Sequence, residues 1–174
     1  MTGGERAPRF SIVTAAYNVG RYLQDFIDSI EAQTHGLDDI EVVMVDDGST
    51  DDTLVMLEQW AERRPGVVRV LTQANAGQGA ARNLGLQHAR GEWITLPDPD
   101  DILEAEYFAR VASFLDRNPE TAMVATNRIF LMEGSGEIVD SHPLRRMFAA
   151  DDQLVDLDQF PDFFHGSAPA SFVR

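Results

Sequence analysis

The chain has 174 residues, 44% of them hydrophobic and 25% charged, a composition that suits one compact globular domain and argues against disorder. Its 29 acidic residues outnumber its 14 basic ones, and the formal charge of −15 disfavours nucleic acid and anionic lipid as partners. The absence of cysteine excludes disulfides, thiolate metal sites and cysteine nucleophiles.

No apolar run in the sequence approaches the length needed to cross a bilayer, so no transmembrane segment is predicted. Residues 1–9 are polar and do not have the apolar core of a secretory signal. We therefore expect a cytoplasmic protein, with any peripheral attachment to a membrane supplied by sequence outside this chain.

Apolar runs alternate with amphipathic segments along most of the chain. The predicted strands are residues 10–14, 40–45, 67–71, 93–96 and 123–132. The predicted helices are residues 20–33, a segment capped by one of residues 49–51 and ending near 64, and residues 78–89 and 104–117. This alternation predicts an α/β fold with a mostly parallel sheet and helices on both faces.

Polar clusters follow the first four predicted strands, where a parallel sheet of this kind binds its ligands. These clusters are Tyr17-Asn18, Asp46-Asp47, Asn75 to Gly79 and Asp98 to Asp101. The last cluster offers several carboxylates in a small space, which suits Mg²⁺ or Mn²⁺ carrying a diphosphate. An acidic, solvated loop that caps the next helix explains the same residues equally well.

Each of the other polar positions also has two explanations. A carboxylate of the segment Asp46 to Asp51 could accept the imide or amide N–H of a pyrimidine or hold a ribose hydroxyl, or the segment could simply be a turn between strand and helix with a good N-cap. Tyr17 could stack on a base or pack locally, and Arg82 could pair with phosphate or with one of the many acids.

The order of the motifs is more specific than any one of them, and it resembles the family 2 glycosyltransferases from about Phe10 to Leu103. The motifs that carry this resemblance are Ala16-Tyr17-Asn18, Gln33-Thr34, Val45 to Asp51, Asn75-Ala76-Gly77, Ala81 to Gly85, Gly91 to Ile94 and Asp98 to Asp101. The resemblance implies a GT-A fold, a nucleotide-diphospho-sugar donor, usually UDP-linked, and a divalent metal.

By this resemblance, Ala15 and Tyr17 line the base pocket and Asp47 reads the base. Arg82 lies beside the base or the phosphates. Asp98 contacts the ribose or metal-bound water, and Asp100 is the main metal ligand, with Asp98 beside it. Pro97 and Pro99 depart from the family pattern, but they leave the carboxylates in place.

The resemblance also divides the chain into a flexible N-terminus (1–8), a nucleotide-sugar-binding core (9–132) and the start of an acceptor-side region (133–174). The catalytic base of the family is expected beyond Arg174. The acids between 151 and 162 stand in no recognisable base motif, and residues 170–174 read as the middle of an element.

We therefore expect an inverting, metal-dependent sugar transfer from a UDP-sugar to an acceptor hydroxyl. The acceptor would be a carbohydrate, a lipid-linked group or a polymer, as in cell-wall or polysaccharide biosynthesis. Two alternatives are a non-catalytic nucleotide-binding module and a phosphohydrolase that uses Asp98 and Asp100. The phosphohydrolase alternative leaves the first two polar clusters unexplained.

Overall fold

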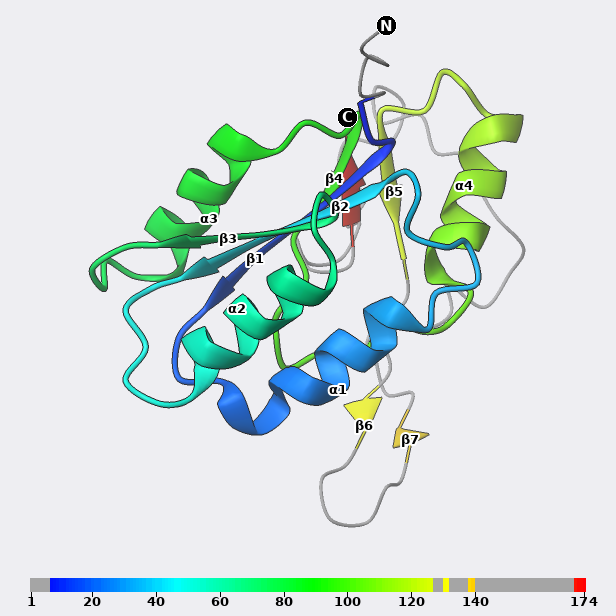
Figure 1. Ribbon diagram of the computed structural model, residues 1–174. Helices are drawn as coiled ribbons and strands as arrows, with labels where there is room; N and C mark the ends of the chain where they lie inside the picture. The colour runs from blue at the N-terminus through cyan, green and yellow to red at the C-terminus, as the bar shows by residue number, and fades with distance from the viewer. Residues whose placement is uncertain (1–6, 127–129, 132–137, 140–170) are drawn as a thin grey trace, which may run out of the picture.

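The computed structural model describes residues 7–126, 130–131, 138–139 and 171–174 (Figure 1). The strands are β1 (Phe10–Ala16), β2 (Ile40–Asp46), β3 (Val68–Thr72), β4 (Trp93–Thr95), β5 (Met123–Ala125), β6 (Phe130–Leu131), β7 (Ile138–Val139) and β8 (Ser171–Val173). The helices are α1 (Gly20–Glu31), α2 (Thr53–Arg63), α3 (Gln78–His88) and α4 (Tyr107–Arg117). None of the helices in this part of the chain is long and apolar enough to span a membrane.

The main sheet has six strands in the order β3-β2-β1-β4-β8-β5. Strands β1 to β4 run parallel to one another, and β8 runs antiparallel to both of its neighbours. The predicted mostly parallel sheet is confirmed. The place of β8 was not predicted: this last strand lies inside the sheet, between two strands that come much earlier in the chain.

Two predicted elements were wrong in extent. The strand predicted over residues 123–132 ends at Ala125, because β5 pairs with β8, which has only 3 residues, and β6 pairs instead with β7 in a separate ladder. The helix predicted from Glu104 begins at Tyr107. The carbonyls of Glu104 and Ala105, expected in its first turn, accept hydrogen bonds from Gln33 and Thr34, which lie just after α1.

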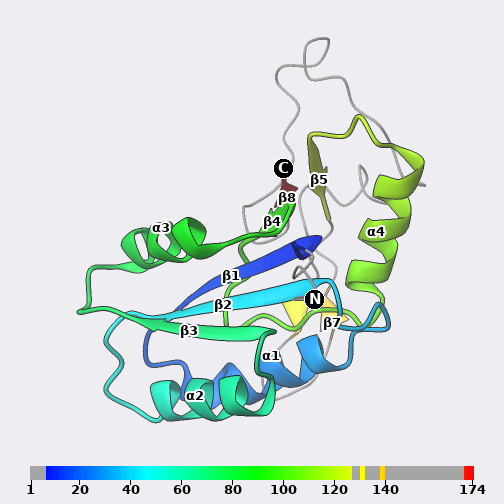
Figure 2. The same cartoon turned by 45° about the horizontal axis from the view of Figure 1, so that its top comes forward.

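The strands alternate between two helical layers, as their two-residue period requires. Phe10 and Ile12 of β1 pack in a large core cluster with side chains from α1, α2 and α4. Ala15 of the same strand faces the other way and packs with Val45 and with Ala81 of α3. Helix α3 covers that second face, as Figure 2 shows, so the prediction of helices on both faces is confirmed.

Helix α3 packs directly against the sheet at a glycine, Gly85. A Cβ atom added to Gly85 would lie 2.5 Å from Cγ1 of Val13 and 3.2 Å from Cγ2 of Val45. Both distances are shorter than ordinary van der Waals contact. The glycine therefore sets how closely α3, and every side chain on it, approaches β1 and β2.

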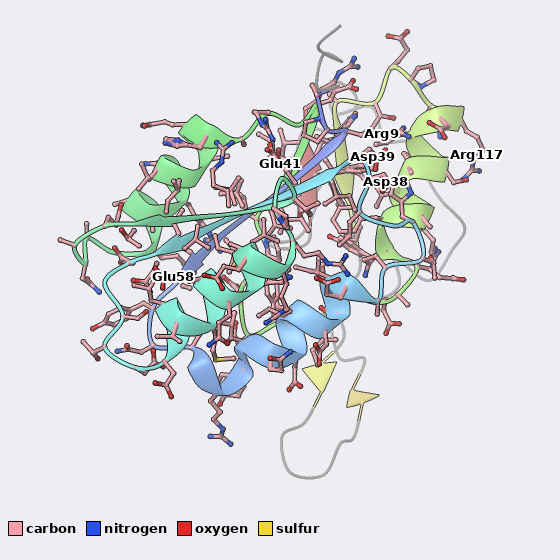
Figure 3. The ribbon with its side chains drawn as sticks, in the orientation of Figure 1. Arg9, Asp38, Asp39, Glu41, Glu58 and Arg117 are labelled. Carbon is pink, nitrogen blue, oxygen red and sulfur yellow. The ribbon has the colours of Figure 1, made fainter. Side chains whose placement is uncertain are left out.

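Glu41 lies in β2 with 3% of its surface exposed and ties β2 to the turn between α3 and β4 (Figure 3). Its carboxylate accepts hydrogen bonds from the Ser11 hydroxyl (2.6 Å), from the Arg90 backbone and guanidinium, and from the Gly91 N–H (3.2 Å). Burial raises the pKa of Glu41, but these hydrogen bonds outweigh it and leave the pKa below its ordinary value.

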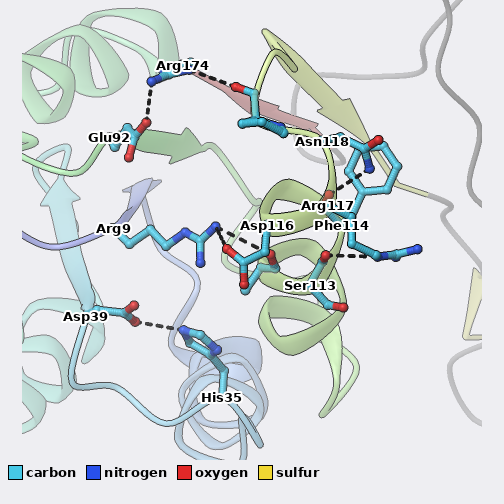
Figure 4. A network of polar contacts seen from close by, with 12 residues as sticks. Arg9, His35, Asp39, Glu92, Ser113, Phe114, Asp116, Arg117, Asn118 and Arg174 are labelled. Atoms are coloured by element: carbon cyan, nitrogen blue, oxygen red, sulfur yellow. Dashed lines mark hydrogen bonds and ion pairs between the residues drawn. The ribbon is translucent and has the colours of Figure 1, made fainter.

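Ion pairs tie the elements together at the end of the sheet where the parallel strands begin (Figure 4). Arg9, just before β1, pairs with Asp116 of α4 at 2.7 Å, and Arg174, just after β8, pairs with Glu92 at 2.8 Å. Such exposed pairs are worth at most about 1 kcal/mol each. These ion pairs therefore join α4 and β8 to the end of the sheet where β1 and β4 begin.

Candidate functional site

The loops after β1 to β4 meet at the carboxyl ends of the parallel strands, as the sequence predicted. Hydrogen bonds join the loop after β1 to the loop after β2, and the loop after β2 to the loop after β3. Helix α3, which follows the third loop, is joined to the loop after β4. The four polar clusters are therefore one connected surface.

Asp47, directly after β2, is 2% exposed and holds the loop between β3 and α3. Its Oδ1 accepts hydrogen bonds from Gln73 Nε2 (2.6 Å) and the Ala76 N–H (2.9 Å), and its Oδ2 accepts one from the Gly77 N–H (2.8 Å). Burial raises the pKa of Asp47, but these bonds outweigh it and lower the pKa below its ordinary value. A carboxylate has about four lone-pair sites, so Asp47 keeps about one for a ligand N–H.

Asp46, its neighbour, shapes the turn after β2. Its Oδ2 accepts hydrogen bonds from the Gly48 N–H (3.2 Å) and the Ser49 N–H (3.1 Å). Its Oδ1 is buried and has no hydrogen-bond partner among the described residues. A buried oxygen without a partner costs free energy, and here it is closed off from an incoming ligand.

Asn18 joins the loop after β1 to the loop after β2. It has a φ of 51°, in the left-handed region that asparagine tolerates better than most residues. Its N–H donates to Ser49 Oγ (3.0 Å), and its Oδ1 accepts from the Thr50 N–H (2.8 Å). These two bonds hold the residue next to Tyr17, whose ring is 48% exposed at the same edge of the sheet.

Asp51 holds the start of α1, a contact that the sequence did not reveal. We expected one of residues 49–51 to cap only the next helix. Asp51 Oδ1 does accept a hydrogen bond from the Thr53 N–H (3.0 Å), but its Oδ2 accepts one from the Gly20 N–H (3.1 Å), the first residue of α1. Thr53 Oγ1 accepts the neighbouring Val19 N–H (2.9 Å). The two residues thus satisfy N–H groups that the start of a helix leaves without internal partners.

Arg82 lies on α3 and pairs with Asp98, so the ion pair weighed as one alternative for this arginine is present. Arg82 Nη2 donates to Asp98 Oδ1 (2.7 Å), and Gln78 Nε2, one turn earlier on the same helix, donates to the same oxygen (3.0 Å). Arg82 Nε is buried and has no partner among the described residues. A buried donor without a partner costs free energy, as the Asp46 oxygen does.

The acidic loop, residues 98–101, leads away from β4 with its carboxylates at different depths. Asp98 is partly buried beside α3, whereas Asp100 is exposed. The two prolines, Pro97 and Pro99, are both buried and flank Asp98.

These carboxylates fit a divalent cation by their chemistry. Within the described residues no three His, Cys, Asp or Glu side chains converge as a complete metal site. Mg²⁺ and Mn²⁺ need only one or two protein carboxylates when phosphate and water complete the shell. Asp98 uses Oδ1 for Arg82 and Gln78, and no bond to its Oδ2 is found among the described residues, which leaves that oxygen and Asp100 to hold a metal.

Ala15 is 8% exposed and packs against Ala81, so most of its side chain is a packing contact under α3. The acids between 151 and 162 lie outside the described residues. A separate hollow lies between α1 and α2, away from these loops, and its polar side chains already pair with one another through Glu31 and Arg64.

The sequence profile of Glycosyl transferase family 2 matches residues 11–172 of this chain. That match covers most of the chain, and the chain therefore belongs to glycosyltransferase family 2. The minor teichoic acid biosynthesis protein GgaB of Bacillus subtilis (strain 168) is 30% identical to it over 166 residues, which is 95% of this chain and 18% of GgaB.

Solved structures agree with the fold. The structure of S. aureus TarS 1–349 in complex with UDP has a TM-score of 0.66 and 29% sequence identity, covering 74% of this chain and 38% of that one. The mannosyltransferase PcManGT from Pyrobaculum calidifontis, in complex with GDP-Man and Mn²⁺, has a TM-score of 0.62 and 28% sequence identity. The match covers 71% of this chain and 36% of PcManGT. The chain spans less than two fifths of the length of each of these three proteins.

Proposed function

We propose that this chain binds the UDP-sugar donor of a glycosyltransferase that uses a divalent metal and inverts the configuration at the anomeric carbon. The observation that carries the proposal is the joined surface of Asp47, Arg82 and Asp98 at the carboxyl ends of the strands in a family 2 domain. Similar proteins are solved with UDP and with GDP-Man and Mn²⁺, which supports a nucleotide ligand at this surface.

Asp47 is suited to read the base. Its lowered pKa keeps it ionised at neutral pH, so it can only accept hydrogen bonds, and the N3–H of uracil is a donor. The half-exposed ring of Tyr17, held through Asn18, offers a face for stacking on the base. Ala15 would close the pocket floor beside them.

Arg82 and Asp98 are suited to the ribose and the diphosphate. The Arg82 guanidinium lies beside Asp98 with part of its surface exposed, and such a cation can pair with a phosphate oxygen. Asp98 Oδ2 and Asp100 would hold Mg²⁺ or Mn²⁺, which neutralises charge that develops on the leaving diphosphate. Residues of this chain would thus bind and orient the donor, and the base that deprotonates the acceptor is expected beyond Arg174.

The acceptor is proposed from the relatives' names alone. GgaB is named for minor teichoic acid biosynthesis, and TarS as a poly(ribitol-phosphate) beta-N-acetylglucosaminyltransferase. We infer an acceptor hydroxyl on a cell-wall polymer or polysaccharide, reached from the cytoplasmic side. The phosphohydrolase alternative loses its support, because the chain belongs to family 2.

Calorimetric titration of UDP and of GDP, each with and without Mn²⁺, tests the donor site. We expect UDP to bind more tightly than GDP, and Mn²⁺ to strengthen UDP binding. Asp100→Asn should remove the Mn²⁺-dependent part, at least about tenfold in affinity, or 1.4 kcal/mol. Asp25→Asn makes the same change on the exposed face of α1 and serves as the control.

Two results would contradict the proposal. Folded protein that binds neither nucleotide would reject a donor site in this chain, and unchanged UDP binding in Asp47→Asn would reject base reading by Asp47. Binding of UDP without sugar transfer, even after the family's downstream region is joined to the chain, would favour the non-catalytic module.

A further inference from the structure

The segment between the acidic loop and α4 is held by Gln33 and Thr34, which follow α1. Between β4 and α4 the chain has no regular structure from residue 96 to 106. Its own backbone bonds there are few: the Asp101 N–H donates to the Asp98 carbonyl (3.1 Å), and the Tyr107 N–H donates to the Glu104 carbonyl (2.9 Å). A loop with so few internal bonds takes its shape from the groups that it contacts.

Gln33, just after α1, makes the main contacts. It is 5% exposed. Its Nε2 donates to the Glu104 carbonyl (2.9 Å) and to the Ser29 carbonyl (3.0 Å), and its Oε1 accepts from the Phe108 N–H (3.2 Å). One side-chain amide therefore links Glu104, in the segment that follows the acidic loop, to Phe108 in the first turn of α4.

The Phe108 N–H belongs to the group of helix-start donors that have no partner within the helix. The residue before α4, Glu106, makes no capping hydrogen bond with its side chain. Gln33 supplies that acceptor from a different part of the chain, 75 residues away. It thus fixes the point at which the segment that follows the acidic loop ends and α4 begins.

Thr34 adds to this contact. Its N–H (2.9 Å) and its Oγ1 (3.1 Å) both donate to the Ala105 carbonyl. At the upstream side, Thr14 of β1 is completely buried, and its Oγ1 donates to the Pro97 carbonyl (3.2 Å). The stretch that carries Asp98 and Asp100 is therefore held between two fixed points.

We propose that Gln33 is a positioning residue for the metal-binding carboxylates of the acidic loop. The proposal rests on the function proposed above, and it concerns a buried amide whose hydrogen bonds go to the backbone of Ser29, Glu104 and Phe108. A buried glutamine that only satisfies backbone groups would change stability when replaced, whereas a positioning residue also changes the affinity of Mn²⁺ at a loop that it does not enter.

Gln33→Met is the test variant, because methionine keeps the length and the helix propensity of glutamine and removes its hydrogen bonds. Gln24→Met is the matched control: the same substitution on the exposed face of α1, at a glutamine that bonds to Asp28 and not to the loop. Thr34→Val is a milder second variant at an exposed position, for the case that Gln33→Met does not fold.

Three quantities are measured on the full chain: the dissociation constant of Mn²⁺ in the presence of UDP, the dissociation constant of UDP without metal, and the hydrogen exchange of the Phe108 amide. We expect Gln33→Met to weaken Mn²⁺ binding in the presence of UDP about tenfold, which is the lower end of the effect seen for groups that orient metal ligands. Phe108 should exchange faster, and metal-free UDP binding and Gln24→Met should stay at wild-type values. Thr34→Val should weaken Mn²⁺ binding by a smaller factor.

The proposal is overturned if folded Gln33→Met binds Mn²⁺ with wild-type affinity. It is also overturned if the variant loses affinity for UDP without metal by the same factor as it loses affinity for Mn²⁺. If Gln33→Met does not fold, unchanged Mn²⁺ affinity in Thr34→Val overturns it. If wild-type protein shows no Mn²⁺-dependent UDP binding and Asp100→Asn behaves identically, the proposed function and the role of Gln33 are both rejected. Metal-dependent binding that is lost in Asp100→Asn and kept in Gln33→Met rejects the role of Gln33 alone.

Discussion

Gly79 and Gly85 lie on the same helix, α3, and substitution to alanine is expected to change stability in opposite directions. At Gly85 a new Cβ would lie 2.5 Å from Val13 Cγ1, and valine has little rotamer freedom with which to move away. At Gly79 a new Cβ meets nothing within 4 Å. The two positions separate the effect of helix propensity from the effect of packing.

The magnitudes follow from these distances. Alanine in place of glycine stabilises a helix by up to about 1 kcal/mol. Overpacking a buried contact costs about 1–3 kcal/mol. Gly79→Ala should therefore gain about 0.5 kcal/mol, whereas Gly85→Ala should lose about 1 kcal/mol net of the propensity gain.

Urea denaturation of both variants measures the difference. For a slope of about 2 kcal/mol per molar urea, the two midpoints should differ by about 0.7 M. Gly85→Ala should also weaken UDP binding, because α3 carries Arg82 and Gln78. A Gly85→Ala protein as stable as Gly79→Ala would refute the close approach of α3 to β1.

Two further predictions concern buried carboxylates with lowered pKa values. Glu41→Gln should destabilise the fold by about 2 kcal/mol at pH 7, since it weakens the hydrogen bonds that Ser11, Arg90 and Gly91 donate to a buried, charged carboxylate. Because the folded pKa of Glu41 lies below its ordinary value of 4.5, its stabilisation is present above that pH and is lost as the pH falls below it. Urea denaturation at pH 7 and at pH 4 should show the difference between variant and wild type shrinking at the lower pH; a constant difference would contradict this. Asp47→Asn should weaken UDP binding about tenfold and lower the melting temperature, because its amide would face the Ala76 and Gly77 N–H groups; unchanged UDP affinity would reject its role at the base.

The sequence predicted the parallel half of the sheet well because its signals are local. The runs around Ile12 and Val43 are apolar on both faces, which is typical of a strand covered on both sides, and the polar residues after them mark where each strand ends. The placement of Asp47 and Asp98 at one edge follows from that pattern and from parallel pairing.

The contacts that complete the site were not predictable in the same way. Gln33 and Glu104 are 71 residues apart, and Asp51 and Gly20 are 31 apart. No periodicity links such positions, because each bond depends on how two loops meet after the sheet has formed. The same holds for β8, whose 3 residues carry too short a pattern to indicate which strands it lies between.

The position of β8 sets an order for folding during synthesis. Strands β1 to β4 can pair with one another as soon as Thr95 has left the ribosome. Among the described strands of the main sheet β5 pairs with β8 alone, so Met123–Ala125 must wait until residues 171–173 have been made. We expect the nascent chain to carry a paired β1–β4 half of the sheet while about eighty further residues are made, roughly 4–16 s at typical synthesis rates. Throughout that interval the edge of β4 is open to pairing with the wrong strand.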